Sequence, residues 1–237
     1  MGDHSDCGCG KCEELLQPYL DRELTDVEQA EAARHLEACG YCARRYRFER
    51  WRFDTAAGKE EMLARRIGRN ELDVIDVMLA IVDAQREYAS ADRDRNGALE
   101  YARKFASSAG KQDGLYWPTK AGEPQSPLGP LVVRATGEGY AKQKGPTPYH
   151  GYHFRMLNGQ GPGASGGALD YVVRGRMIGG FAAIAYPAKY GSSGVMTFIV
   201  NHDGVVYQKD LGPQTATRAA AITKFDPGQG WTAVPAK

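Results

Sequence analysis

Apolar residues change their spacing along the chain, and the change predicts two kinds of structure. From Leu72 to Tyr88 they recur so densely that they nearly encircle a helix, which predicts a long helix buried on more than one side. After Gly129 short segments rich in β-branched and aromatic residues alternate with turn formers, which predicts antiparallel strands. These segments are LVVRA, YHGYHFRML, LDYVVRG, GFAAIAY, VMTFIVN and GVVYQKD. A long helix followed by such strands indicates an α+β domain.

Two shorter signals complete this domain. The stretch NHDG, residues 201–204, lies between the last two segments and predicts a tight hairpin. The stretch TATRAAAITKF, residues 215–225, predicts a final helix. We therefore expect one long helix, an antiparallel meander and a short closing helix.

The first 55 residues have a different pattern, which predicts short helices. Thr25 followed by Glu28 matches a capping box, in which each side chain bonds the other residue's backbone N–H. A helix should therefore run from about Asp26 to Ala38, and Gly40 should interrupt it. The next stretch contains two glycines and many charges. We interpret residues 1–55 as a helical module, 56–69 as a linker and 70–237 as the α+β domain.

Charge and hydropathy limit the partners of the chain. A quarter of the residues are charged, yet the net charge is only +1, so the whole chain has no strong attraction to nucleic acid or to an anionic membrane. No apolar run approaches the ~18 residues that a membrane span requires. The first residues are polar rather than those of a secretory leader. We therefore expect a cytoplasmic protein.

All five cysteines lie within the first 42 residues, at Cys7, Cys9, Cys12, Cys39 and Cys42. An odd number at one end of the chain does not fit a disulfide framework, and metal binding explains it better. On the predicted helix, His35 and Cys39 are four residues apart and share a face, and Cys42 follows just beyond. Thiolates and imidazole are the ligands that zinc prefers, so these three residues predict a zinc site.

Two other interpretations of these residues are open. The pairs Cys9–Cys12 and Cys39–Cys42 could form a four-cysteine site, although their 26-residue separation exceeds the usual ~15–20. The capped helix within that separation argues against such a ribbon. Alternatively, the cysteines are ordinary small residues and His35 is a surface histidine.

The segments YLDREL and HLEACGYC carry a resemblance to the zinc-binding anti-sigma-factor family, the His-Cys-Cys zinc fingers, over about residues 9–50. In that family a cysteine stands ten residues before the tyrosine of the first segment, which is Cys9 here. The resemblance therefore implies zinc as cofactor, with Cys9, His35, Cys39 and Cys42 as ligands and Cys12 as the alternative. It implies a sigma factor or another protein as partner. Pro18 departs from the family pattern.

The small size of this module couples its fold to the metal. About 45 residues cannot bury enough apolar surface to fold unaided, so we expect zinc binding and folding to be one event. Cys7 and Cys12, when they are not ligands, stand beside the metal-bound thiolates in the sequence. An oxidant could pair such a thiol with a ligand and expel zinc, so we also expect a redox-responsive switch.

The rest of the chain resembles a bacterial family known as domain of unknown function 2950, from about Arg69 to Pro235. The likeness is carried by NELDVIDVMLAIVDAQREYA, DGLYWP, SPLGPLV, PYHGYHFRML, GRMIGGFAAIAYPAKYG, GVMTFIV and GVVYQKDLGP. This family has no established activity, and its members are usually exported. A long helix ahead of an antiparallel sheet also resembles the heads of type IV pilins.

The stretch DRDRNGALE resembles the start of an EF-hand calcium loop, with candidate ligands Asp92, Asp94, Asn96 and Glu100. The bidentate glutamate expected at position twelve is Arg103, so we favour a hydrogen-bonded turn over a calcium site. His150 and His153 are expected on opposite faces of a strand, which prevents them from sharing a metal. Tyr116, Trp117 and Pro118 are expected in the core rather than in a ligand platform.

No set of nucleophile, base and orienting carboxylate follows from the spacing, so we do not expect an enzyme. The function we favour is zinc-dependent protein binding of the anti-sigma kind, with a thiol-redox response. The alternative is an envelope-associated structural or ligand-binding protein with a pilin-head-like domain.

Overall fold

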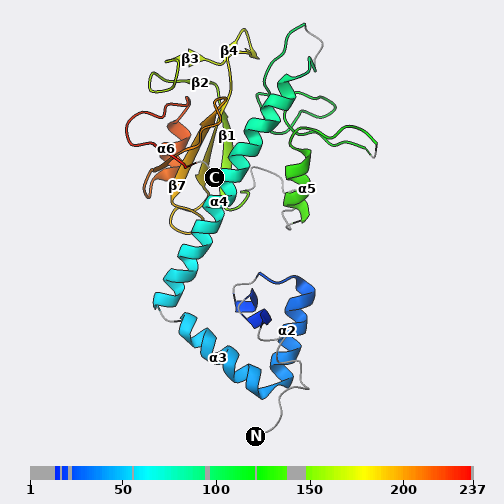
Figure 1. The fold of residues 1–237 in the computed structure, drawn as a ribbon, viewed down its shortest axis with the longest axis vertical. Helices are drawn as coiled ribbons and strands as arrows, with labels where there is room; N and C mark the ends of the chain where they lie inside the picture. Colours follow the sequence, from blue (N-terminus) through cyan, green and yellow to red (C-terminus); the bar gives the residue numbers. More distant parts are fainter. Residues whose placement is uncertain are drawn as a thin grey trace. The chain divides into compact units, whose positions relative to one another are not determined.

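The computed structural model describes residues 14–16, 18–20, 23–54, 56–93, 97–120, 122–137 and 148–235 (Figure 1). It divides into two compact units, Met1–Arg66 and Ile67–Lys237. The boundary falls inside helix α4 (Ala56–Ala89), which includes all of the predicted linker 56–69. The domain ranges themselves stay a prediction. Helices in the first unit and a long helix on a five-stranded antiparallel sheet in the second confirm the α+β class.

The first unit is built on helices α2 (Asp26–Ala38) and α3 (Gly40–Asp54). Residues 14–16 and 18–20 are also helical. The predicted capping box is confirmed, since Glu28 N–H donates to Thr25 Oγ1 at 3.4 Å and Thr25 N–H donates to Glu28 Oε2 at 3.0 Å. The predicted start and end of α2 are therefore confirmed as well.

The break between these helices lies one residue earlier than predicted. Cys39 has extended backbone angles (φ −106°, ψ 104°), and Gly40 is the first residue of α3 rather than the interruption. The expectation for Gly40 was therefore wrong. Gly40 is not in the left-handed conformation that makes glycine a helix terminator, since its φ is not positive.

Little apolar surface is buried in the first unit. Among its described residues only Leu16, Ala32 and Cys42 are buried. The rings of Tyr19 and Tyr46 meet edge to face with centroids 5.5 Å apart. So few buried side chains cannot offset the conformational entropy of ordering these helices.

The second unit contains a five-stranded antiparallel sheet in the order β1-β6-β7-β8-β9. Its strands are β1 (Tyr152–Leu157), β6 (Ala182–Pro187), β7 (Met196–Asn201), β8 (Tyr207–Asp210) and β9 (Thr232–Ala233). Two small hairpins pair β2 (Gly159–Gln160) with β3 (Leu169–Asp170), and β4 (Val172–Val173) with β5 (Arg176–Met177).

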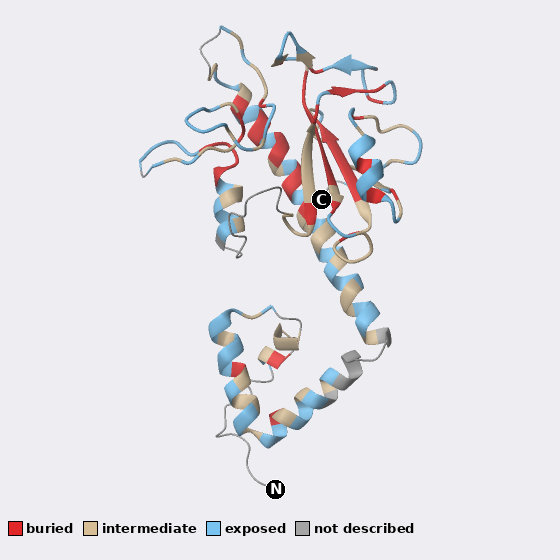
Figure 2. Cartoon of the chain, turned by 180° about the vertical axis from the view of Figure 1, so that it is seen from behind, coloured by how far each residue is buried: buried red, intermediate tan, exposed pale blue. Residues whose placement is uncertain are grey.

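Helices α4 and α6 (Thr215–Ala221) cover opposite faces of the sheet (Figure 1). Met156 of β1 faces α4, because its sulfur lies 3.9 Å from Gln85 Nε2. The next residue toward the start of the strand, Arg155, donates to the carbonyls of Ala219 and Ile222 at the end of α6. Successive strand residues point to opposite faces, which fixes the three layers. Buried residues concentrate on the central strands and on the part of α4 against them (Figure 2).

Five of the six predicted strand segments contain strands: β1, β6, β7 and β8 lie in four of them, and β3 and β4 lie in LDYVVRG. The segment LVVRA is an exception, since it forms helix α5 (Gly129–Gly137), and the strand prediction was wrong. Pro130 stands in the first turn of α5, where a missing N–H removes no helical bond and the fixed φ favours helix. A short apolar run alone does not distinguish helix from strand.

The predicted turn at NHDG is present, but the connection is longer than a tight hairpin. Gly204 N–H donates to Asn201 O at 3.0 Å, and Gly204 has φ of 80°. The last pair of β7 and β8 is Ile199 with Tyr207, so residues 200–206 lie outside the ladder. The predicted final helix is confirmed as α6, and β9 follows it. Among the described residues, no helix is both long enough and apolar enough to cross a bilayer.

Candidate metal centre

The last turn of α2 and the first turn of α3 bring His35, Cys39 and Cys42 together. Their ligand atoms all lie within 4.8 Å of one another. Helical spacing places His35 and Cys39 on one face of α2, and Cys39 N–H donates to His35 O at 2.8 Å. The extended Cys39 then turns the chain, so that Cys42 in the next helix points back to the same place.

The histidine has a buried nitrogen that no described residue bonds. His35 Nε2 is shielded from solvent and makes no hydrogen bond within the described part of the chain. A buried polar atom left in this state costs about 1–3 kcal/mol. Cys42 is only 2% exposed, and the side chain of Leu36 packs against it. A metal ion bound by the imidazole and the two sulfurs would satisfy this nitrogen, so the donor set fits zinc.

The surroundings of Cys39 favour its thiolate form, which is the form that binds metals. The backbone N–H of Cys42 is the largest cause that lowers the pKa of the Cys39 thiol. Partial burial opposes the shift, while the backbone N–H of Tyr41, the Cys42 thiol and the charge of Arg44 act in the lowering direction. The ligand pattern did not identify Arg44, although it begins the basic run that follows Cys42 in the sequence.

The predicted fourth ligand lies outside the described residues, as do all three of Cys7, Cys9 and Cys12. Cys9, or Cys12 as the alternative, therefore stays a prediction. Three of the four predicted ligands converge: His35 lies on α2, Cys42 on α3, and Cys39 is the residue between the two helices.

Comparison with protein families identifies both parts of the chain. The family described as "Protein of unknown function (DUF2950)" matches residues 45–234. The chain belongs to the DUF2950 family. A second family, described as "Putative zinc-finger", matches residues 9–43 and so includes His35, Cys39 and Cys42. No curated protein matches this DUF2950 chain, and no solved structure does. The resemblance to pilin heads therefore stays a prediction.

The candidate calcium ligands of the DUF2950 region are Asp92, Asp94, Asn96 and Glu100. Asp92 Oδ2 accepts a hydrogen bond from Gly97 N–H at 2.8 Å, which is the kind of turn that we favour. Glu100 Oε2 lies 3.8 Å from Arg176 Nε. Asp94 and Asn96 lie outside the described residues, so the calcium site stays a prediction.

Two histidines of the DUF2950 region are arranged differently from the expectation. His150 lies in a turn with φ of 46° rather than on a strand, and its Nδ1 is 3.1 Å from Asp73 Oδ2 on α4. His153 is on β1, beside the ring of Tyr186. The expectation that both belong to one strand was wrong, because the strand begins only at Tyr152.

The aromatic stretch of the DUF2950 region has a mixed environment. Tyr116 and Trp117 are partly buried and pack against the core, as expected. With Pro118 they also line an open groove of about 1070 Å³. The Arg93 guanidinium lies 5.3 Å from the centre of the Trp117 ring, so the cation covers part of the indole.

Proposed function

We propose that the first unit is a zinc-dependent protein-binding module of the anti-sigma kind, and that the chain is regulatory rather than catalytic. The observation that carries the proposal is the convergence of one imidazole and two thiols, within 4.8 Å, with a shielded His35 Nε2 that bonds to no described residue. Cys9 completes the set, with Cys12 as the alternative. When bound, zinc supplies a structural crosslink between α2, α3 and the residues before them.

The small core of the first unit supports this role for zinc. Three buried side chains among its described residues leave the packing of α2 on α3 dependent on another source of stability. A structural zinc ion supplies about 10–16 kcal/mol of apparent binding free energy in small metal-dependent folds. Removal of zinc should therefore unfold the first unit and leave the sheet of the second unit intact.

Exposed side chains on this unit support a role in binding a protein. Val27 on α2 is 76% exposed and Tyr41 on α3 is 38% exposed, although both are side chains that contribute apolar area at interfaces. Helix α3 carries five arginines in residues 43–52, which match an acidic partner surface. A sigma factor is the partner that the zinc-finger match favours. This partner places the unit in the cytoplasm, and that location is part of the proposal.

A thiol-redox response belongs to the same proposal. Peroxide accepts two electrons from two thiolates, which form one S–S bond, and with two protons it leaves as water. When a zinc ligand enters such a disulfide bond, zinc is released and the helices that it ordered unfold. The response is absent if peroxide removes no zinc while the thiols are accessible.

Capture of sigma factors tests the proposed partner. The tagged full chain is incubated with purified sigma factors from the same genome, with zinc and after chelation. Binding should require zinc, should be lost in Cys39→Ser and should persist in Cys7→Ser, the matched control outside the ligand set. Failure of the zinc-loaded chain to bind any sigma factor, together with capture of envelope proteins, would instead favour an envelope-associated structural or ligand-binding role.

A further inference from the structure

Strand β1 forms one edge of the five-stranded sheet, and β6 is its one partner among the described strands. Ala188 N–H donates to Gly151 O at 2.9 Å, and Tyr152 stands opposite Pro187 in the register. In an antiparallel ladder, hydrogen-bonded and non-hydrogen-bonded pairs alternate. Residues 153, 155 and 157 therefore bond β6, and the N–H and C=O groups of Phe154 and Met156 face away from it.

Described residues of the chain close both ends of this edge, and none of them pairs with its middle. Tyr152 exchanges two hydrogen bonds of 2.9 Å with Tyr149. Asn158 O accepts from Tyr171 N–H at 2.9 Å. Between these points, the outward N–H and C=O groups of Phe154 and Met156 bond to no residue in the described part of the chain. Such a row of backbone groups is a template for another strand.

A groove of about 570 Å³ lies along these residues. Residues 103–105 form its other wall. Ala102, the residue before them, is held by the side chain of Gln85: Gln85 Nε2 donates to Ala102 O at 2.8 Å, and Ala102 N–H donates to Gln85 Oε1 at 2.9 Å. The partly buried side chains of Phe105, Phe154 and Met156 supply its apolar part. This volume is within the ~300–1,000 Å³ range of ligand-binding clefts.

The charge of the groove selects among possible occupants. Arg103, Lys104 and Arg155 are among the residues that line it, and none of the described lining residues has a carboxylate. Lys104 Nζ is paired with Asp113 Oδ2 at 2.7 Å. The two arginines donate to backbone carbonyls, of which Gly175 O is the acceptor for Arg103, and a carbonyl does not neutralise their charge. An acidic segment therefore complements the groove.

We propose that the open edge of β1 binds an extended, acidic segment of a partner protein as an additional β-strand. Main-chain bonds to Phe154 and Met156 give the affinity, and Arg103 selects acidic side chains. The opposite edge of the sheet is the two-residue strand β9, which offers a shorter template. This site belongs to the second unit and does not depend on zinc in the first.

The test uses the ¹⁵N-labelled full chain and a capped heptapeptide of alternating valine and glutamate. We expect chemical-shift changes and slower amide exchange at Phe154 and Met156. The same peptide N-methylated at alternate residues cannot form the ladder and should not bind. A valine–lysine heptapeptide should bind at least about tenfold more weakly, because the groove is cationic.

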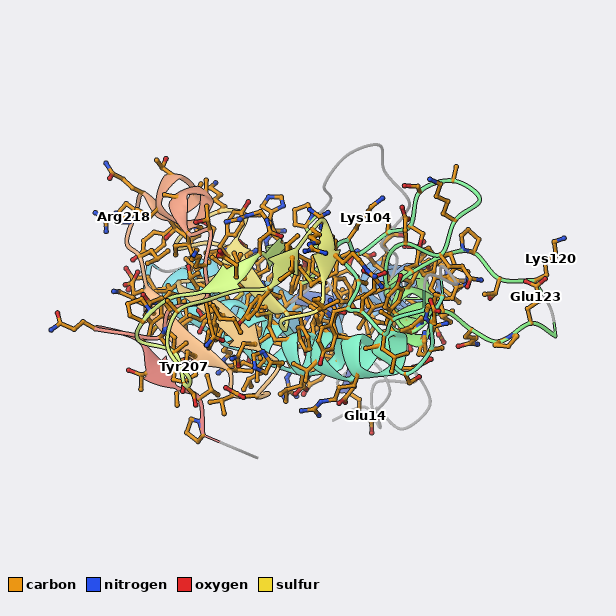
Figure 3. The ribbon with its side chains drawn as sticks, turned by 90° about the horizontal axis from the view of Figure 1, so that it is seen from above. Glu14, Lys104, Lys120, Glu123, Tyr207 and Arg218 are labelled. Atoms are coloured by element: carbon orange, nitrogen blue, oxygen red, sulfur yellow. The ribbon has the colours of Figure 1, made fainter. Side chains whose placement is uncertain are left out.

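A pair of matched variants distinguishes the effect of a charge in the groove on peptide binding from the effect of a charge elsewhere on the surface. Arg103→Gln should weaken binding of the valine–glutamate peptide about tenfold, whereas Lys120→Gln should not change it. Figure 3 shows Lys120 in a loop distant from Lys104, outside the residues that line the groove. Three results overturn the proposal: no binding at millimolar peptide, equal binding of the N-methylated peptide, or protection of Phe154 and Met156 that rises with protein concentration alone. The last result would make a second copy of this chain the occupant.

Discussion

Glu71 on helix α4 and Met196 on strand β7 are joined by a hydrogen bond of 2.9 Å, in which the backbone N–H of Met196 donates to Glu71 Oε1. The same oxygen accepts from Val195 N–H, also at 2.9 Å. One carboxylate oxygen therefore satisfies two backbone donors at the start of β7. This contact fixes the long helix against the sheet at the point where the second unit begins.

Replacement of this carboxylate should destabilise the second unit. Glu71→Ala leaves two partly buried N–H groups without an acceptor, and we expect a loss of about 2–4 kcal/mol in the free energy of unfolding. Urea denaturation followed by circular dichroism measures it. The control is Asp83→Ala on the same helix, whose carboxylate is 79% exposed and lies 3.6 Å from Arg86. A change above about 0.5 kcal/mol in the control, or none in Glu71→Ala, contradicts the assignment.

The buried amide of Gln85 should hold residues 101–105 in place. Its side chain is fully buried and exchanges two hydrogen bonds with the backbone of Ala102. Gln85→Leu should cost about 2 kcal/mol and accelerate exchange of the Ala102 amide, since both backbone groups lose their partner. Gln214→Leu at an exposed site is the matched control. Unchanged exchange at Ala102 would show that other contacts hold this segment.

The capping box of α2 should contribute to zinc affinity. Thr25→Ala removes the acceptor for Glu28 N–H and should destabilise α2 by about 1 kcal/mol. Folding and metal binding are coupled, so zinc affinity measured by chelator competition should fall about fivefold. Thr136→Ala in α5, where the hydroxyl bonds Val132 O, is the control and should leave the affinity unchanged. If Thr25→Ala and Thr136→Ala bound zinc with equal affinity, formation of α2 would not be coupled to metal binding.

The pair of Lys104 and Asp113 should make the second unit slightly less stable in acid. Hydrogen bonds from Lys104 and from the backbone of Ser108 lower the pKa of Asp113 from 3.8 to about 2. The unfolded chain therefore takes up this proton first as the pH falls. The stabilisation is complete above pH 3.8 and is lost as the pH falls through about 2.

This contribution is small, because the Asp113 side chain is 37% exposed and water screens the pair. We expect less than about 1 kcal/mol from Asp113→Asn near neutral pH. The difference between wild type and variant should vanish at about pH 2, as measured by denaturation at each pH. A difference that persists in acid would assign the effect to packing instead of charge.

Local patterns explain most of what the sequence predicted correctly. The spacing of His35 and Cys39 is one helical turn, and the box of Thr25 and Glu28 spans three residues, so neither depends on distant contacts. The burial of Val77, Met78 and Ile81 on α4 follows from their periodicity in the same way. The cluster of His35, Cys39 and Cys42 and the main helix could therefore be predicted from neighbouring residues alone.

The errors arose where a weak local preference was overridden. The segment LVVRA was predicted as a strand, yet it lies in helix α5, because Pro130 favours the first turn of a helix. The groove beside β1 was not predicted, because it joins Arg103 to Met156 across residues distant in the sequence. The spacing of residues within one segment does not predict which strand will lie at an open edge of a sheet.

Zinc analysis of the full chain and of His35→Asn tests the central claim most directly. Elemental analysis of reduced, freshly purified protein should give about one zinc ion per chain, and His35→Asn should lose it while the second unit keeps its fold. Zinc-free wild-type protein would contradict the account. Full zinc content in His35→Asn would also contradict it, because the metal would then be held by a four-cysteine set that excludes the histidine.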